Sequence, residues 1–78
     1  MKKRSISIYG HQTSVSLEPE FWAVVDAMAE ARDLSVSALI RTLDDERLAR
    51  MPERNLSSYL RVAALEHAGS VSVADPGD

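Results

Sequence analysis

Residues 11–25 read HQTSVSLEPEFWAVV, and the hydrophobic periodicity of this stretch changes at Glu18 and Pro19. Before this point Val15 and Leu17 alternate with serine, which is typical of a strand with one buried face. After it, apolar residues recur at helical spacing, and a proline flanked by acidic residues favours a helix N-terminus. The stretch therefore predicts a strand that leads directly into a helix.

A second alternating stretch lies N-terminal to this strand. Ile6 and Ile8 alternate with polar residues, and Gly10 separates them from the strand that follows. A single strand or hairpin is only marginally stable in water. We therefore expect the strand before Glu18 to pair antiparallel with the same strand of a second copy. Residues 5–9 are compatible with either a further strand or a loose arm.

Three helices are predicted after the strand. The first extends to about Arg32, and Ser35 is a suitable N-cap for the second, which ends at about Arg50 before Pro52. Asn55 or Ser57 can cap the third, for which Gly69 is a C-terminal stop. The predicted units are an arm or strand (1–11), a core (12–51), a third helix (52–69) and a flexible acidic tail (70–78).

The length of the chain favours oligomerisation. A chain of 78 residues buries little of its surface on folding, and with no cysteine it has no disulfide to stabilise it. Two copies that interlock their helices beneath a shared ribbon would solve this problem. The apolar residues expected in this shared core are Val15, Leu17, Phe21, Val25, Met28, Leu39, Ile40 and Leu43.

The charges are unevenly distributed. The net charge is −3, yet the charged residues before Glu18 are all basic: Lys2, Lys3 and Arg4. A local basic segment on an acidic protein can still bind phosphate, and we expect these three side chains to do so. The longest apolar run has five residues, from Phe21 to Val25, so no membrane span is expected and we expect a cytoplasmic protein.

A paired ribbon of this kind would present one polar face. Gln12, Ser14 and Ser16 would point outward from the predicted strand. A two-stranded ribbon fits the major groove of double-stranded DNA, where each base pair shows its own pattern of donors and acceptors. The N-terminus of the second predicted helix, at residues Ser35, Val36 and Ser37, could bind a phosphate.

At these residues the sequence resembles the ribbon-helix-helix superfamily of the MetJ and Arc type. More narrowly, it is similar to short bacterial ribbon-helix-helix proteins with a GHxTSxSLExxFW string. About 60 of the 78 residues fall within this resemblance, and its most specific positions are Gly10, His11, Thr13, Ser14, Leu17, Glu18, Phe21, Trp22, Asn55, Leu56, Ser57 and Ser58.

The resemblance implies a mainly α fold with a short N-terminal β-ribbon, an intertwined homodimer and an additional C-terminal helix. It implies sequence-specific DNA binding and transcriptional control, with repression as the leading hypothesis. Base contacts carry over to Gln12, Ser14 and Ser16, and phosphate contacts to Ser35, Val36 and Ser37. The alternative is a module that binds a partner protein, such as an antitoxin or anti-regulator.

No catalytic residue, metal site or cofactor is expected. The run Asp44, Asp45 and Glu46 would lie on a helix, where consecutive side chains point in directions about 100° apart and cannot converge on one ion. These acids can instead pair with arginines at helical spacing. Ser57 and Ser58 have no nearby histidine base and fit a helix cap and first turn. We therefore do not expect an enzyme.

Overall fold

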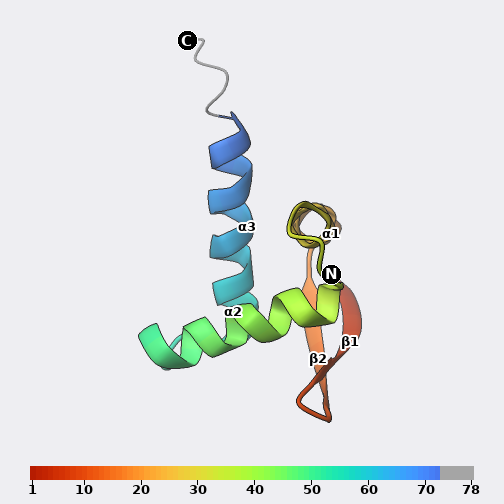
Figure 1. Ribbon diagram of the computed structural model, residues 1–78, viewed down its shortest axis with the longest axis vertical. Coiled ribbons are helices and arrows are strands. Elements are labelled where there is room, and N and C mark those ends of the chain that lie inside the picture. Colours follow the sequence, from red (N-terminus) through yellow and green to blue (C-terminus); the bar gives the residue numbers. More distant parts are fainter. Residues whose placement is uncertain (73–78) are drawn as a thin grey trace.

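The protein begins with two strands and continues as three helices (Figure 1). This computed structural model describes residues 1–72. The elements are β1 (Lys2–Ile8), β2 (His11–Leu17), α1 (Pro19–Ala31), α2 (Val36–Arg50) and α3 (Leu56–Ser72). The predicted order of a ribbon followed by helices, with an additional C-terminal helix, is confirmed.

The two strands pair with each other in an antiparallel hairpin. The turn consists of Tyr9 and Gly10, with φ of 49° and 82°. Positive φ at both positions is the type I′ geometry, whose twist matches that of the flanking strands. β1 therefore provides β2 with a partner within the chain. The expected pairing of β2 with the same strand of a second copy would use the other edge of β2, and it stays a prediction.

One face of the hairpin covers the helices. Its four apolar residues, Ile6, Ile8, Val15 and Leu17, are buried together with residues from all three helices. The indole Nε1 of Trp22 in α1 donates a hydrogen bond to the carbonyl oxygen of Lys2 at 2.7 Å. This bond holds the start of β1 against α1.

The helix α1 begins where the change in periodicity predicts. Glu18 is its N-cap and Pro19 its first residue. At the other end Asp33 adopts a φ of 58°. The backbone N–H of Leu34 donates to the Ala29 carbonyl (2.9 Å), and that of Asp33 donates to the Glu30 carbonyl (3.1 Å). This is a Schellman motif in which aspartate occupies the position that glycine usually takes.

The substitution Asp33→Gly is therefore expected to stabilise the fold. Glycine adopts positive φ without a Cβ penalty, which outweighs its greater freedom in the unfolded chain. We expect a gain of roughly 0.5–1 kcal/mol, which raises the melting temperature by roughly 2–8 °C in a domain of this size. Thermal unfolding followed by circular dichroism measures it. Asp33→Ala is the control and should lower the melting temperature, whereas a lower value for Asp33→Gly would contradict the argument.

Polar side chains cap the N-termini of α2 and α3, and an arginine of α2 binds the joint between these two helices. The hydroxyl of Ser35 caps α2 by accepting a hydrogen bond from the Ala38 N–H (3.1 Å), and the Asn55 carboxamide oxygen caps α3 by accepting one from the Ser58 N–H (2.8 Å). The guanidinium of Arg47 donates to the carbonyl of Arg54 in the joint (2.9 Å). The predicted cap at Ser35 and, of the two candidates for α3, the cap at Asn55 are confirmed.

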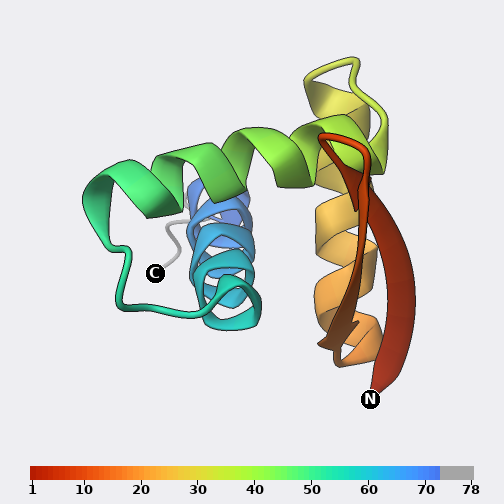
Figure 2. The same cartoon turned by 90° about the horizontal axis from the view of Figure 1, so that it is seen from below.

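The third helix packs against both α1 and α2 (Figure 2). It buries Leu60 and Ala64 in the core and reaches the start of α1, where the Arg61 Nε lies 3.0 Å from a carboxylate oxygen of Glu18. A hydrogen bond from its own backbone N–H and then this guanidinium lower the pKa of Glu18 below its ordinary value. The third helix thus folds back over the first two.

The predicted end of α3 is wrong. The helix continues through Gly69 to Ser72. Glycine costs about 1 kcal/mol relative to alanine inside a helix, which one position near a helix end tolerates. The tail expected over residues 70–78 is therefore helical at its start, and its remaining residues, 73–78, lie outside the described part of the chain.

The residues expected in a shared dimer core are already buried within one chain. Val15, Leu17, Val25, Met28, Leu39, Ile40 and Leu43 belong to the core, and Phe21 packs against it partly buried. The single chain of residues 1–72 thus has a closed apolar centre, to which Trp22 contributes the largest buried side chain.

Candidate nucleic-acid interface

The outward face of the hairpin is polar and lies opposite the buried face. It carries six side chains, three from each strand, which the antiparallel register sets in three facing pairs: Lys3 with Ser16, Ser5 with Ser14, and Ser7 with Gln12. Five of the six are exposed, and Ser16 is half-buried. The predicted base-contacting residues Gln12, Ser14 and Ser16 therefore do lie together on one face.

Half of this face was not anticipated from the sequence. Lys3 was expected only as a phosphate contact, and Ser5 and Ser7 were given no role. The alternation of Ile6 and Ile8 could have identified these residues, because it places the odd-numbered residues of β1 on the face opposite the core. The missing step was the pairing of β1 with β2, which puts both sets of side chains side by side.

The face suits the acceptor-rich floor of the major groove. It combines one ammonium group, one carboxamide and four hydroxyls, and residues 1–17 contain no carboxylate. Each of these groups can donate a hydrogen bond, and base edges in the major groove present acceptors at guanine, adenine and thymine. The hairpin is thus a polar ribbon without local negative charge on a protein whose net charge is −3.

A hydrogen bond within the face joins the two strands. The Ser5 hydroxyl lies 2.7 Å from Oε1 of Gln12, and both side chains are exposed. The pair is diagonal, because Ser7 and not Ser5 faces Gln12 directly in the register. Gln12 is therefore linked to a side chain on the neighbouring strand.

Arg4 lies on the other side of the ribbon. Its guanidinium is centred 4.4 Å from the Trp22 ring, and its Nη1 forms an ion pair with the Asp26 carboxylate at 2.8 Å. The hydrogen bond to Asp26 raises the pKa of Arg4. A DNA phosphate would have to compete with Asp26 for this side chain, whereas Lys2 and Lys3 are exposed and form no ion pair among the described residues.

The tip of the hairpin is attached to α2. The Tyr9 hydroxyl donates to a carboxylate oxygen of Asp45 at 2.8 Å, and the Arg41 guanidinium lies 5.6 Å from the centre of the Tyr9 ring. The hydrogen bond to Asp45 raises the pKa of Tyr9. These contacts, with the Trp22 bond at the opposite end, hold the ribbon at both ends against the helices.

The N-terminus of α2 has the features of a phosphate contact. Ser35 satisfies the Ala38 N–H with its own hydroxyl, so the N–H groups of Val36 and Ser37 remain without an intrahelical partner. Backbone N–H groups at a helix N-terminus bind anions. The three residues predicted at this position therefore form the first turn of α2 and its cap.

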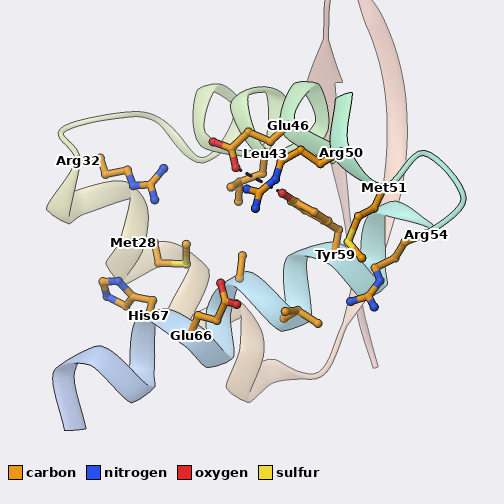
Figure 3. Close-up of a pocket in the computed structure, with 12 residues that line it drawn as sticks. Met28, Arg32, Leu43, Glu46, Arg50, Met51, Arg54, Tyr59, Glu66 and His67 are labelled. Atoms are coloured by element: carbon orange, nitrogen blue, oxygen red, sulfur yellow. Dashed lines mark hydrogen bonds between the residues drawn. The ribbon is translucent and has the colours of Figure 1, made fainter. Parts of the chain in front are cut away.

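A cavity on another part of the surface lies between the three helices (Figure 3). Its volume is about 360 Å³, and its lining combines apolar residues, among them Met28, Leu43 and Val62, with charged ones. Three arginines line it, Arg32, Arg50 and Arg54, and none of them forms an ion pair with another residue among 1–72. Glu46 and Glu66 also line it, so its charge is mixed with an excess of cations.

The described residues offer no metal site. Within residues 1–72, no three histidine, aspartate or glutamate side chains lie close enough together to hold an ion. The acidic run in α2 is spread over separate contacts, because Asp44 pairs with Arg47 at 2.8 Å whereas Asp45 accepts the hydrogen bond from Tyr9.

Comparisons with known proteins support the fold. Searches among curated proteins and among solved structures found no significant match. A family model described as a ribbon-helix-helix domain matches residues 1–68. This match includes the hairpin, α1, α2 and most of α3, which is more than half of the chain. On this basis the protein belongs to the ribbon-helix-helix domain family.

Proposed function

We propose that the protein is a homodimeric DNA-binding transcriptional regulator, and specifically a repressor. Members of its family are typically DNA-binding regulators or antitoxins. The observation that carries the proposal is the outward face of the hairpin, which is polar, free of carboxylates and supported from behind by the core. Repression would follow from occupancy of the site, without a chemical step.

In this proposal the hairpin enters the major groove. Gln12, Ser14 and Ser16 contact base edges, and Lys2 and Lys3 neutralise phosphates at the open end of the ribbon. The first turn of α2 at Ser35, Val36 and Ser37 binds a further phosphate. Arg4 reaches phosphate only by leaving Asp26, so its contribution is smaller than that of the two lysines. Phosphate contacts position the protein, and base contacts specify the sequence.

A second copy would add to a core that is already closed. Proteins of this family generally bind DNA as dimers. The described part of the chain forms a sheet of two strands, so each strand keeps one edge with unpaired backbone groups. Such an edge is a template for pairing with another chain. We infer that the homodimer forms when two ribbons pair through such an edge. The predicted core residues would then pack mainly against residues of their own chain.

The remaining features fit a regulator. Among residues 1–72 no helix is long and apolar enough to cross a membrane. We infer a cytoplasmic protein of bacterial type that acts without a metal or cofactor and has no enzymatic activity.

Light scattering alone and with a mixed pool of duplex DNA tests the proposal. We expect a particle of twice the chain mass of 8.6 kDa, which takes up DNA at low salt and releases it as salt rises, because phosphate contacts displace counterions. A folded dimer that does not bind any duplex at low salt would refute the DNA-binding proposal. A stable monomer that binds DNA would refute the dimer alone.

The second candidate function is a protein-interaction module, and the cavity between the helices favours it. Its unpaired arginines Arg32, Arg50 and Arg54 suit an acidic segment of a partner, and its wall includes Met51 and Val62, which are partly exposed. A stoichiometric partner should co-purify from the native host and protect α3 from proteolysis. The double substitution Arg32→Glu and Arg50→Glu should abolish this association, and its persistence would contradict the assignment to the cavity.

A further inference from the structure

The guanidinium of Arg4 is held against α1 by two kinds of contact. Its Nη1 and Nη2 atoms donate to Oδ1 and Oδ2 of Asp26 at 2.8 and 3.2 Å, and the group is centred 4.4 Å from the Trp22 ring. A pair of parallel N–H···O bonds of this kind is also how a guanidinium binds a phosphate. Asp26 therefore occupies the donors of Arg4 that a DNA phosphate would require.

We propose that the Asp26 carboxylate makes an autoinhibitory contact, which lowers the affinity of the ribbon for DNA by keeping Arg4 from phosphate. This inference rests on the proposed DNA binding. The ion pair is open to solvent, since the side chains of Arg4 and Asp26 are 34% and 47% exposed, so it can separate without unfolding the core. Arg4 directly follows Lys2 and Lys3 in β1, and a released Arg4 adds a third cation to that end of the ribbon.

The contact should set the strength of DNA binding and not the sequence that is preferred, because phosphate contacts carry no sequence information. Competition with an exposed ion pair weakens a phosphate contact by about two- to fivefold. For the two copies of Arg4 in a dimer, release should therefore strengthen binding by about 4- to 25-fold. It should also steepen the slope of log K against log salt by about 1.8, at 0.9 per contact.

Two alanine substitutions on α1 test the proposal. Asp26 and Glu30 lie one helical turn apart, both are exposed, and replacement of either by alanine changes the net charge from −3 to −2. Glu30 forms no ion pair among residues 1–72, so Glu30→Ala is the matched control. Fluorescence anisotropy of labelled duplexes at several salt concentrations measures affinity and slope. We expect Asp26→Ala to gain the full effect on every duplex and Glu30→Ala to gain much less.

The substitution Arg4→Gln separates the release of Arg4 from the loss of a negative charge near DNA. If charges act independently, Asp26→Ala gives the same gain with and without Arg4, because the effects of independent changes add. In an autoinhibitory contact the gain depends on Arg4. We therefore expect Asp26→Ala, when combined with Arg4→Gln, to give only the small gain of Glu30→Ala and to leave the salt slope unchanged.

The outcomes separate this inference from the function on which it rests. If no variant binds any duplex at low salt, the proposed DNA binding fails and the inference fails with it. If the wild type binds DNA but Asp26→Ala binds no more tightly than Glu30→Ala, or gains equally with and without Arg4, the autoinhibitory role of Asp26 is refuted while the DNA-binding function stands. A gain confined to one sequence would also refute it, because Arg4 would then contact a base.

Discussion

Deletion of residues 52–78 is expected to leave a chain that unfolds or aggregates at room temperature. The deletion removes Leu60 and Ala64, which are exposed to 1% and 0%, and uncovers the apolar faces of α1 and α2 beneath them. It also removes Arg61, the partner of Glu18 at the start of α1. Small domains are stable by only about 5–15 kcal/mol, and truncation of a single buried leucine to alanine costs about 2–5 kcal/mol. Loss of the whole helix exceeds that margin.

Circular dichroism and light scattering measure the effect, and α3 itself offers a matched pair of substitutions. Within α3, Leu60→Ala should cost about 2–5 kcal/mol, whereas Leu65→Ala, on the same helix but 67% exposed, should cost less than about 0.5 kcal/mol. A truncated chain with the melting temperature of the full chain would refute the role of α3 in closing the core.

Local sequence signals predicted most of the helix boundaries. The start of each helix depends on chemistry within a few residues of it. The signals are Pro19 after an acidic residue for α1, Ser35 for α2 and Asn55 for α3. The end of α1 was harder, because aspartate occupies a left-handed position at Asp33 where glycine is the usual signal. Gly69 gave the opposite error, since it suggested a stop inside a continuing helix.

The strand pairing was missed because the turn has an unusual sequence. Type I′ turns favour asparagine or aspartate before glycine, and here the first position is Tyr9. The role of Tyr9 is a tertiary contact, because its hydroxyl donates a hydrogen bond to Asp45 of α2, 36 residues away in sequence. A local pattern cannot report such a long-range contact.

The candidate site was predicted as far as side-chain parity allows. Alternation placed Gln12, Ser14 and Ser16 on one face without knowledge of the partner strand. The register with β1 was required to add Lys3 and Ser5 to that face and to reveal the diagonal bond to Gln12. Arg4, in contrast, was grouped with the lysines on charge alone, and its contacts with Trp22 and Asp26 depend on the packing of β1 against α1.

The double substitution Lys2→Glu and Lys3→Glu is expected to weaken binding to every duplex, on the order of 100-fold at low salt. Both side chains are exposed at the open end of the ribbon. A dimer would bring four such lysines to DNA. If all four contact phosphate, they contribute about −3.6 to the slope of log K against log salt, at −0.9 per contact. The variant should lose this part of the slope, whereas Gln12→Ala should change the base preference and leave the slope intact.

The control is Arg32→Glu with Arg50→Glu, because it makes the same change in charge in the cavity between the helices. Each pair lowers the net charge by 4, from −3 to −7, so a loss of binding that depends only on net charge would be equal in both. We expect the cavity variant to retain most of its affinity and all of its base preference. Titrations at several salt concentrations measure both quantities. Equal losses in the two variants would refute a specific role for the ribbon lysines, because distant charges would then matter as much as those beside the reading face.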